Sequence, residues 1–195
     1  MDLKKFKLIG INYFKNNTVE VARNLLDCYL ITDKKGVICG GRIVETEAYL
    51  GFEDKASHAS VGPTRRNSVM FGPAGYGYVY LIYGLHCCFN IVCEKKDVPG
   101  AVLIRAIEPE IGVDIMKKRR GKEKSLDLTS GPAKLTQALG ITLKDNGKLL
   151  QQNGVLIMKR NNSRPRALCS GSRIGITKSI ELNYRFYIKD SEFVS

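Results

Sequence analysis

Short strand-forming segments follow one another along this chain, and many are separated only by turns. Cys28–Ile31 and Gly36–Tyr49 lie on either side of a turn at Asp33–Gly36, and Tyr78–Ile82 and Cys87–Cys93 form a second predicted hairpin. Parallel neighbours would need long crossover connections, so this spacing predicts a largely antiparallel sheet. Further strands are expected at Ala101–Ile107, Val155–Lys159, Ser172–Ile176 and Tyr184–Ile188.

Helices are predicted in three places, one before the first of these strands and two between later strands. Thr18 is a suitable N-cap for a helix over roughly 19–27, and a second helix is expected near 110–119. Pro132 and Gly140 fit the first turn and the end of a third helix over 132–139. A length of 195 residues suits one domain. We therefore predict an α+β fold in a single domain spanning residues 1–195.

Positive charge is concentrated in the second half of the chain. The formal net charge is +12, with 13 basic and 10 acidic side chains in residues 1–97 but 18 and 9 in residues 98–195. Such a basic half points to a polyanionic partner, either nucleic acid or a membrane surface. The alternative is a basic face that only contacts solvent.

The cysteine and histidine content gives little support to disulfides or a metal site. The six cysteines include no C-x-x-C pair, and the chain has only two histidines, so no structural metal is expected. The first residues contain no apolar signal segment, and no apolar run approaches the ~20 residues of a membrane span. We therefore expect a cytoplasmic chain with reduced thiols and no membrane partner.

Two carboxylates stand in a strand that otherwise belongs to a core. Strand alternation places Ile43, Glu45, Glu47 and Tyr49 on one face. Arg105 lies in the apolar segment Ala101–Ile107, where a guanidinium needs an anion or an opening to a cleft. Either Arg105 and the carboxylates form a buried ion pair that fixes strand register, or one carboxylate is a general base in a cleft.

Tyrosines are concentrated in the second predicted hairpin. Tyr78 and Tyr80 share a strand face, and Tyr83 lies at the tip, before Gly84. An aromatic side chain at a hairpin tip suits a wedge that opens a base step in DNA. The alternative is the ordinary preference of strands for tyrosine.

A long glycine- and proline-containing segment over residues 51–76 has no clear period. Loops of this length inside a domain are usually either functional or disordered. The segment contains His58 and the sequence Thr64-Arg65-Arg66-Asn67, whose donors suit contacts with phosphate.

Blocks spread over nearly the whole chain resemble the alkyladenine (3-methyladenine) DNA glycosylases. The blocks are Arg42–Gly51, Asp54, His58, Thr64–Asn67, Met70–Phe71, Tyr78–Gly84, Asn90, Leu103–Pro109, Ser130–Leu135 and Arg173–Gly175. The family commonly has proline where Arg65 stands, and the resemblance is looser over Ser172–Ser195. The resemblance implies a curved, open-barrel-like sheet with flanking helices and a protruding hairpin.

The resemblance also implies catalytic roles. Glu47 matches the general base that activates water, and Arg105 and the backbone of Ile174 match groups that position this water. No lysine stands in the Glu45–Tyr49 strand or in the tyrosine hairpin, so a Schiff base is not expected. We therefore expect a monofunctional enzyme that leaves an abasic site and needs no metal or organic cofactor.

Binding roles follow in the same way. Tyr49 and Tyr80 match aromatic walls of a base pocket, and His58 matches a group that hydrogen-bonds the purine edge. Asn90 matches a pocket-floor residue that disfavours the amino group of guanine, and Tyr83 matches the side chain that fills the gap in the duplex. The expected substrates are 3-methyladenine, hypoxanthine and ethenoadenine in duplex DNA, bound by a monomer in the cytoplasm or on the nucleoid.

Two other classes of function compete with this prediction. A non-catalytic nucleic-acid-binding domain could use Tyr78, Tyr80 and Tyr83 as a stacking platform, although the neighbouring carboxylates would repel phosphate. A metal-dependent hydrolase would need ligands from the acidic and histidine side chains. Its candidate ligands are Glu45, Glu47, Asp54, His58 and His86.

Overall fold

The computed structural model describes residues 5–161 and 166–195, and a nine-stranded antiparallel sheet dominates these residues. Seven strands are hydrogen-bonded in the order β1-β7-β2-β3-β6-β5-β4, and β9 pairs with both β3 and β8 beside this path. The strands are β1 (Phe6–Leu8), β2 (Tyr29–Lys34), β3 (Val37–Tyr49), β4 (Gly77–Ile82), β5 (His86–Val92), β6 (Ala101–Ile111), β7 (Val155–Arg160), β8 (Leu168–Gly171) and β9 (Arg185–Ile188).

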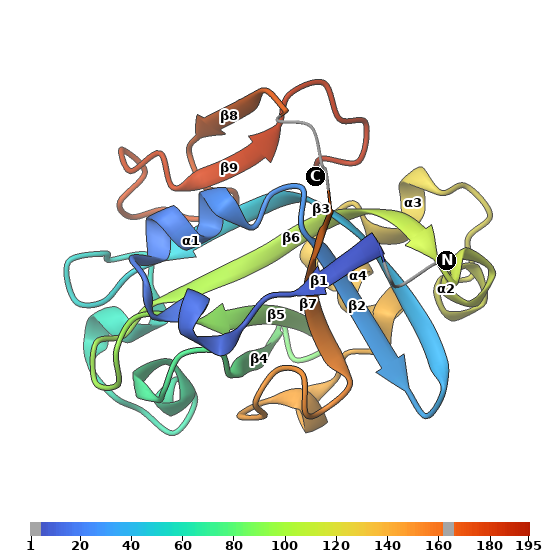
Figure 1. The fold of residues 1–195 in the computed structure, drawn as a ribbon. Coiled ribbons are helices and arrows are strands. Elements are labelled where there is room, and N and C mark those ends of the chain that lie inside the picture. The colour runs from blue at the N-terminus through green and yellow to red at the C-terminus, as the bar shows by residue number, and fades with distance from the viewer. Residues whose placement is uncertain (1–4, 162–165) are drawn as a thin grey trace.

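The sheet is curved into a half-barrel, as the α+β prediction and the family resemblance led us to expect (Figure 1). The most extensive strand pairing in the sheet is that of β3 with β6. Its register shifts between Gly40 and Gly41 and again around Glu45. Such β-bulges bend a strand and increase its twist. At the first shift, a Cβ on Gly41 would lie 2.0 Å from the carbonyl oxygen of Glu108, so the close approach of β3 and β6 requires glycine there.

Helices cover the sheet and complete the core. α1 (Thr18–Asn24) packs on β3 and β6, and α4 (Pro132–Leu139) packs on β5 and β6. The remaining helical segments are α2 (Val113–Arg120), α3 (Leu126–Thr129), η2 (Ile11–Lys15), η3 (His58–Val61), η4 (Ser68–Phe71) and η5 (Leu143–Asp145). Within the part of the chain that the structure describes, no helix has the length and apolar character to cross a membrane.

Three local predictions are corrected by the structure. The N-cap of α1 is Asn17, whose side chain accepts from the backbone N–H groups of Val19 and Glu20, whereas Thr18 is buried and hydrogen-bonds Glu94. β6 continues past Pro109 to Ile111, because Pro109 lies at a register shift where its missing N–H is tolerated. Residues 172–176 form no strand; they follow β8 as an irregular segment.

The bulge in β3 also changes which residues share a face. Val44 is left out of the pairing between Ile43–Ile107 and Glu45–Ala106. Ile43 therefore lies in the main hydrophobic core with Val44, not with the carboxylates as simple alternation predicted. Beyond the bulge, Glu45 and Glu47 keep a common face, which is where the site forms.

Candidate active site

β3 and β6 bring a fully buried carboxylate and a guanidinium together. Glu47 is 0% exposed, and its Oε2 lies 3.2 Å from Nη1 of Arg105. The same oxygen accepts a hydrogen bond of 2.8 Å from the hydroxyl of Tyr49, two residues further along β3. Oε1 accepts one of 2.7 Å from the backbone N–H of Ile174. Both oxygens are thus fixed, and among the described residues Oε1 accepts from Ile174 N–H alone.

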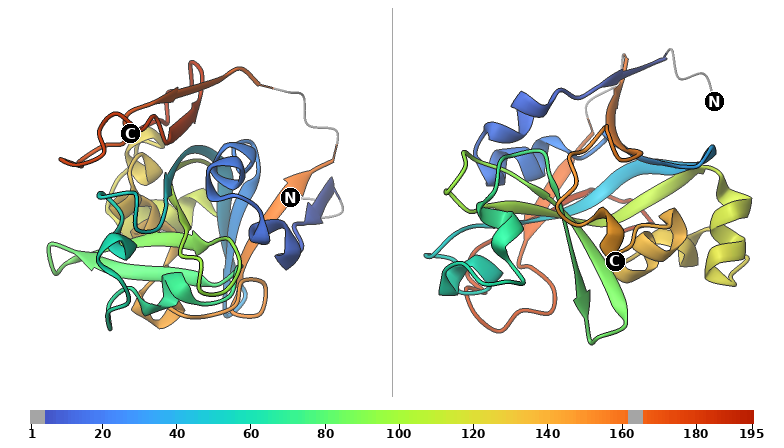
Figure 2. Two further views of the ribbon diagram at one scale, coloured as in Figure 1. Left: turned by 90° about the vertical axis from the view of Figure 1, so that its left-hand side faces the viewer. Right: turned by 90° about the horizontal axis from the view of Figure 1, so that it is seen from below.

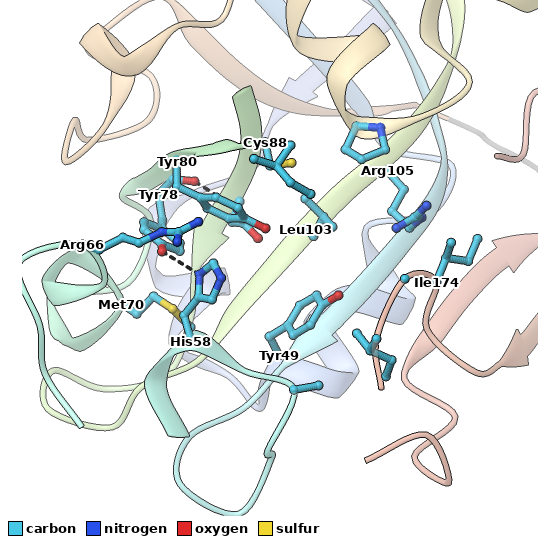
Figure 3. A pocket seen from close by; sticks show the side chains of 16 residues that line it. Tyr49, His58, Arg66, Met70, Tyr78, Tyr80, Cys88, Leu103, Arg105 and Ile174 are labelled. Atoms are coloured by element: carbon cyan, nitrogen blue, oxygen red, sulfur yellow. Dashed lines mark hydrogen bonds between the residues drawn. The ribbon is translucent and has the colours of Figure 1, made fainter. Parts of the chain in front are cut away.

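A cavity of about 220 Å³ opens beside this carboxylate. Tyr49, Arg105 and Ile174 line it, whereas Glu47 lies directly behind these three residues and does not itself line the cavity. Figure 3 shows the Tyr49 ring between His58 on one side and Arg105 and Ile174 on the other. The predicted pocket residues His58, Tyr80 and Asn90 also line the cavity, so the structure brings all of them together.

Aromatic rings form one wall of the cavity. The ring centroids of Tyr78 and Tyr80 lie 5.2 Å apart, and the His58 ring meets Tyr80 edge-on at 4.6 Å. Burial raises the pKa of Tyr78 to about 12, and burial together with nearby Cys88 raises that of Tyr80. Burial and the negative charge of Glu47 raise the pKa of Tyr49. These hydroxyl groups therefore stay protonated and neutral around pH 7.

His58 is held as a neutral imidazole at the edge of this wall. Its Nδ1 lies 2.9 Å from the hydroxyl of Tyr78, shown as a dashed line in Figure 3. Burial lowers the pKa of His58, and the positive charge of Arg66 lowers it further. Nε2 is the ring nitrogen left for a bound molecule. A neutral imidazole can offer either a donor or an acceptor there, depending on its tautomer.

Tyr83 lies at the exposed tip of the β4–β5 hairpin. Its side chain is 86% exposed, and its backbone has a φ of +52°, an uncommon conformation for a large non-glycine residue. Figure 2 shows this hairpin protruding from the body of the molecule. The tip therefore holds an aromatic ring away from the core, where it is free to contact another molecule.

Known proteins with similar sequences decide what kind of site this is. The sequence model of methylpurine-DNA glycosylase (MPG) matches residues 12–192. The chain belongs to the methylpurine-DNA glycosylase family. It is 47% identical over 186 residues to a Methanoculleus marisnigri protein named "Putative 3-methyladenine DNA glycosylase", with 94% of this chain and 96% of the relative covered. Proteins of the same name from Chlorobium phaeobacteroides and Francisella tularensis are 47% and 46% identical, over 96% and 91% of this chain and 94% and 93% of theirs.

Membership in the methylpurine-DNA glycosylase family confirms the resemblance and makes the chain a DNA N-glycosylase, an enzyme of base excision repair. A non-catalytic binding domain is therefore set aside. The metal-hydrolase alternative finds no ligand set either: among residues 5–161 and 166–195, no three His, Cys, Asp or Glu side chains gather so that they could hold a metal ion. Its proposed ligands Glu45, Glu47 and Asp54 are each paired with arginine.

In this glycosylase, the loop Thr64–Asn67, which we predicted to contact phosphate, is held in shape by the side chain of Asn67. Asn67 is 1% exposed; its side chain accepts from the backbone N–H of Thr64 and donates to the carbonyl groups of His58 and Gly62. Thr64, Arg65 and Arg66 are exposed. The side chain of Asn67 is thus used inside the loop, and its contact with DNA stays a prediction.

A buried ion pair between Arg173 and Asp54 lies beside the candidate active site, and the sequence did not predict this pairing. Arg173 contacts both carboxylate oxygens of Asp54 at 2.5 and 2.7 Å, and both side chains are 0% exposed. Its guanidinium also donates to the carbonyl of Ala48 and lies 4.7 Å from the ring centroid of Tyr49. The only indication in the sequence was the place of both residues in the family blocks.

Replacing Arg66 by glutamine should raise the pKa of His58, because the substitution removes the positive charge that disfavours the imidazolium. Titration of the His58 ring protons by NMR measures this directly. His86, which lies at the start of β5, is the internal control in the same spectrum. An unchanged His58 titration would show that burial alone sets its protonation.

Proposed function

We propose that this protein removes alkylated or deaminated purines from duplex DNA by hydrolysing the N-glycosidic bond of a flipped-out nucleotide. The proposed substrates are the 3-methyladenine, hypoxanthine and ethenoadenine class, and the product is an abasic site. The relatives named as 3-methyladenine DNA glycosylases support the first of these substrates. The observation that carries the proposal is Glu47, fixed directly behind the wall of an aromatic cavity by three wall residues, Arg105, Tyr49 and Ile174.

Glu47 is the proposed general base. Among residues 5–161 and 166–195, Ile174 N–H is the one donor to its Oε1, so a lone pair remains for a water molecule. Glu47 accepts a proton from this water as its oxygen bonds to the anomeric carbon of the sugar. The purine leaves with the electron pair of the glycosidic bond. A cationic alkylated purine leaves as a neutral base, whereas hypoxanthine and ethenoadenine leave as anions that take up a proton from solvent water. Glu47 then returns its proton to solvent. Arg105, within reach of both Glu47 and the cavity, orients the water.

The cavity is the proposed site of the extruded purine. Tyr49 and Tyr80 form its aromatic walls, where base stacking contributes about 1–3 kcal/mol. His58 hydrogen-bonds the purine edge through Nε2, because Nδ1 is engaged with Tyr78. Asn90 is 3% exposed and is fixed by a hydrogen bond to the carbonyl of Tyr78, which suits a rigid floor that disfavours the amino group of guanine.

The rest of the duplex is proposed to bind around the cavity as a complex with one monomer. Thr64, Arg65 and Arg66 contact phosphates from the loop that Asn67 orders, and the net charge of +12 supplies sequence-independent affinity. No metal or organic cofactor has a step in this mechanism. We propose that the single domain, residues 1–195, acts in the cytoplasm on nucleoid DNA.

Single-turnover incubation with defined duplexes tests the proposed function. Each duplex carries hypoxanthine, 3-methyladenine or ethenoadenine opposite a normal base, and alkali converts abasic sites into strand breaks. We expect breaks only after alkali, because a monofunctional enzyme does not cut the strand itself. If none of the three bases is released, the proposed function is wrong. Breaks without alkali would instead overturn the monofunctional mechanism.

Replacing Tyr83 by serine should lower the single-turnover rate about 10-fold, because the ring no longer fills the gap left by the extruded nucleotide and unstacking costs a few kcal/mol. The fold should be unaffected, since Tyr83 is 86% exposed. A fluorescent base beside the lesion reports flipping independently of chemistry. Phe52→Ser, at an aromatic ring that is 52% exposed and does not line the cavity, is a control for loss of an exposed aromatic ring outside the hairpin. Flipping and turnover equal to those of the unmodified protein would contradict the wedge.

A further inference from the structure

A second buried carboxylate lies beside the proposed general base, and the mechanism above does not use it. Glu45 precedes Glu47 by two residues on β3 and is also 0% exposed. Its Oε1 accepts from Nε of Arg185 at 2.6 Å, and its Oε2 accepts from the backbone N–H of Ser195 at 2.7 Å. A carboxylate held this firmly is suited to hold other groups in place.

Arg105 bridges the two carboxylates. Its Nε lies 3.3 Å from Oε1 of Glu45, and its Nη1 lies 3.2 Å from Oε2 of Glu47. Nε and Nη2 also donate to the hydroxyl of Ser195, at 3.2 and 3.1 Å. An arginine facing a lone carboxylate favours a two-point contact. Here only one nitrogen of Arg105 reaches Glu47, because the others are engaged on the Glu45 side.

Arg185, on the neighbouring strand β9, is the second guanidinium that contacts Glu45. β9 pairs with β3 so that Arg185 lies opposite Glu47, while its guanidinium turns to Glu45 and lies 4.8 Å from the ring centroid of Tyr187. Two carboxylates and two guanidiniums thus form one cluster, in which Glu45, Glu47 and Arg105 are buried and Arg185 is partly exposed. Removing Glu45 or Arg185 therefore changes how Arg105 is shared between Glu45 and Glu47.

We propose that Glu45, supported by Arg185, is a positioning residue that restricts Arg105 to a single contact with Glu47. The consequence is that Glu47 keeps an oxygen lone pair and enough basicity to take a proton from water. This inference rests on the proposed function of Glu47. The other charged or titratable groups near Glu47 are Tyr49 on β3, Cys88 on β5, Arg173 before Ile174, and Arg185 on β9.

Replacing Glu45 by glutamine should release Arg105 to contact Glu47 at two points. The single-turnover rate at neutral pH should fall at least about 10-fold, because a misplacement of about 1 Å near the reacting atoms can cost as much as about 100-fold. The acidic limb of the pH–rate profile should move to lower pH by about one unit, since a negative charge is lost and a positive one moves closer. Binding to a duplex with a stable abasic-site analogue should be unchanged.

Replacing Arg185 by glutamine should move the acidic limb of the pH–rate profile in the opposite direction. Glu45 then has one guanidinium partner fewer and draws Arg105 away from Glu47, so the acidic limb moves to higher pH. Glu108→Gln is the matched control, because it neutralises an Arg–Glu pair with Arg42 on the same two strands, remote from the cavity. We expect Glu108→Gln to leave the acidic limb in place.

A Glu45→Gln profile that matches the Glu108→Gln profile would overturn the positioning role and leave only a structural ion pair. If Glu45→Gln does not fold, as judged by near-ultraviolet circular dichroism, the direction of the Arg185→Gln shift decides in its place. The unmodified protein separates this inference from the proposed function. If it releases no base, the proposed function fails, and ¹³C NMR titration of the Glu47 carboxyl in both variants still reports whether Arg105 has moved.

Discussion

Replacing Glu47 by glutamine should reduce the single-turnover rate of base release by at least about 100-fold, because a positioned general base contributes about 10²–10⁴-fold. Glutamine has nearly the same shape as glutamate and keeps an oxygen that can accept from Ile174 N–H. It cannot take a proton from water at neutral pH. Binding to a lesion-containing duplex should persist, since Glu47 lies behind the cavity wall and does not line it.

The variant must be compared at equal folded fraction, because Glu47 is 0% exposed and is one of the two carboxylates that Arg105 contacts. In Glu47→Gln, Arg105 retains Glu45, so its charge is not left without a partner. Glu20→Gln, on the exposed side of α1, controls for loss of one negative charge. Turnover of Glu47→Gln within about 10-fold of the unmodified protein would remove Glu47 as the base and leave this mechanism without one.

The centre of this site could be predicted from the sequence because its residues are close together on single strands. Alternation along one strand placed Glu45, Glu47 and Tyr49 on a common face, and a guanidinium in an apolar segment indicated Arg105 as their partner. The first inference depends on the period of a strand, which is fixed by backbone geometry, and the second depends on the cost of burying a guanidinium without an anion. The prediction for Ile43 was wrong because a single unpaired residue, Val44, shifts the phase.

The rest of the site depends on contacts between distant parts of the chain, and no local pattern encodes them. Arg173 and Asp54 are separated by 119 positions, and the segment after β8, where we predicted a strand over Ser172–Ile176, is irregular in the structure. The same limit applies to Glu45, whose partners Arg185 and Ser195 come from the last part of the described chain. The family resemblance gave the position of Ile174, but only the structure shows its N–H bonded to Glu47.

Replacing Asp54 by asparagine should destabilise the protein by about 3–5 kcal/mol, the cost of removing one partner from a buried ion pair. Asp54 accepts both contacts from Arg173 and further hydrogen bonds from the backbone N–H groups of Leu50 and Ala56. The variant leaves the Arg173 charge buried without its counter-charge. Denaturant unfolding at neutral pH measures the loss, with Asp97→Asn, an exposed carboxylate, as the control expected to stay within about 0.5 kcal/mol.

The stability loss caused by Asp54→Asn should depend on pH in a way that identifies the ion pair. Burial alone would raise the pKa of Asp54, but the hydrogen bonds and charge of Arg173 and the amides of Leu50 and Ala56 outweigh it, so the pKa is lowered. A carboxyl whose pKa is lower in the folded state stabilises fully above its unfolded pKa of about 4, and this stabilisation is lost as the pH falls through the folded pKa. The stability difference between the two proteins should therefore narrow below about pH 4. A difference that is constant with pH would mean that shape, and not charge, sets the role of Asp54.

Base release should fall together with stability in Asp54→Asn, because Arg173 directly precedes Ile174, whose backbone N–H fixes Oε1 of Glu47. When Arg173 loses its ion pair with Asp54, the N–H of Ile174 is no longer held against the Glu47 carboxylate. Oε1 of Glu47, which should face the water, is then free to turn. The rate measured well below the unfolding midpoint should therefore decrease even where the protein is fully folded. A folded Asp54→Asn protein with an unchanged rate would show that Ile174 is held in place by its other neighbours, and that the ion pair serves stability alone.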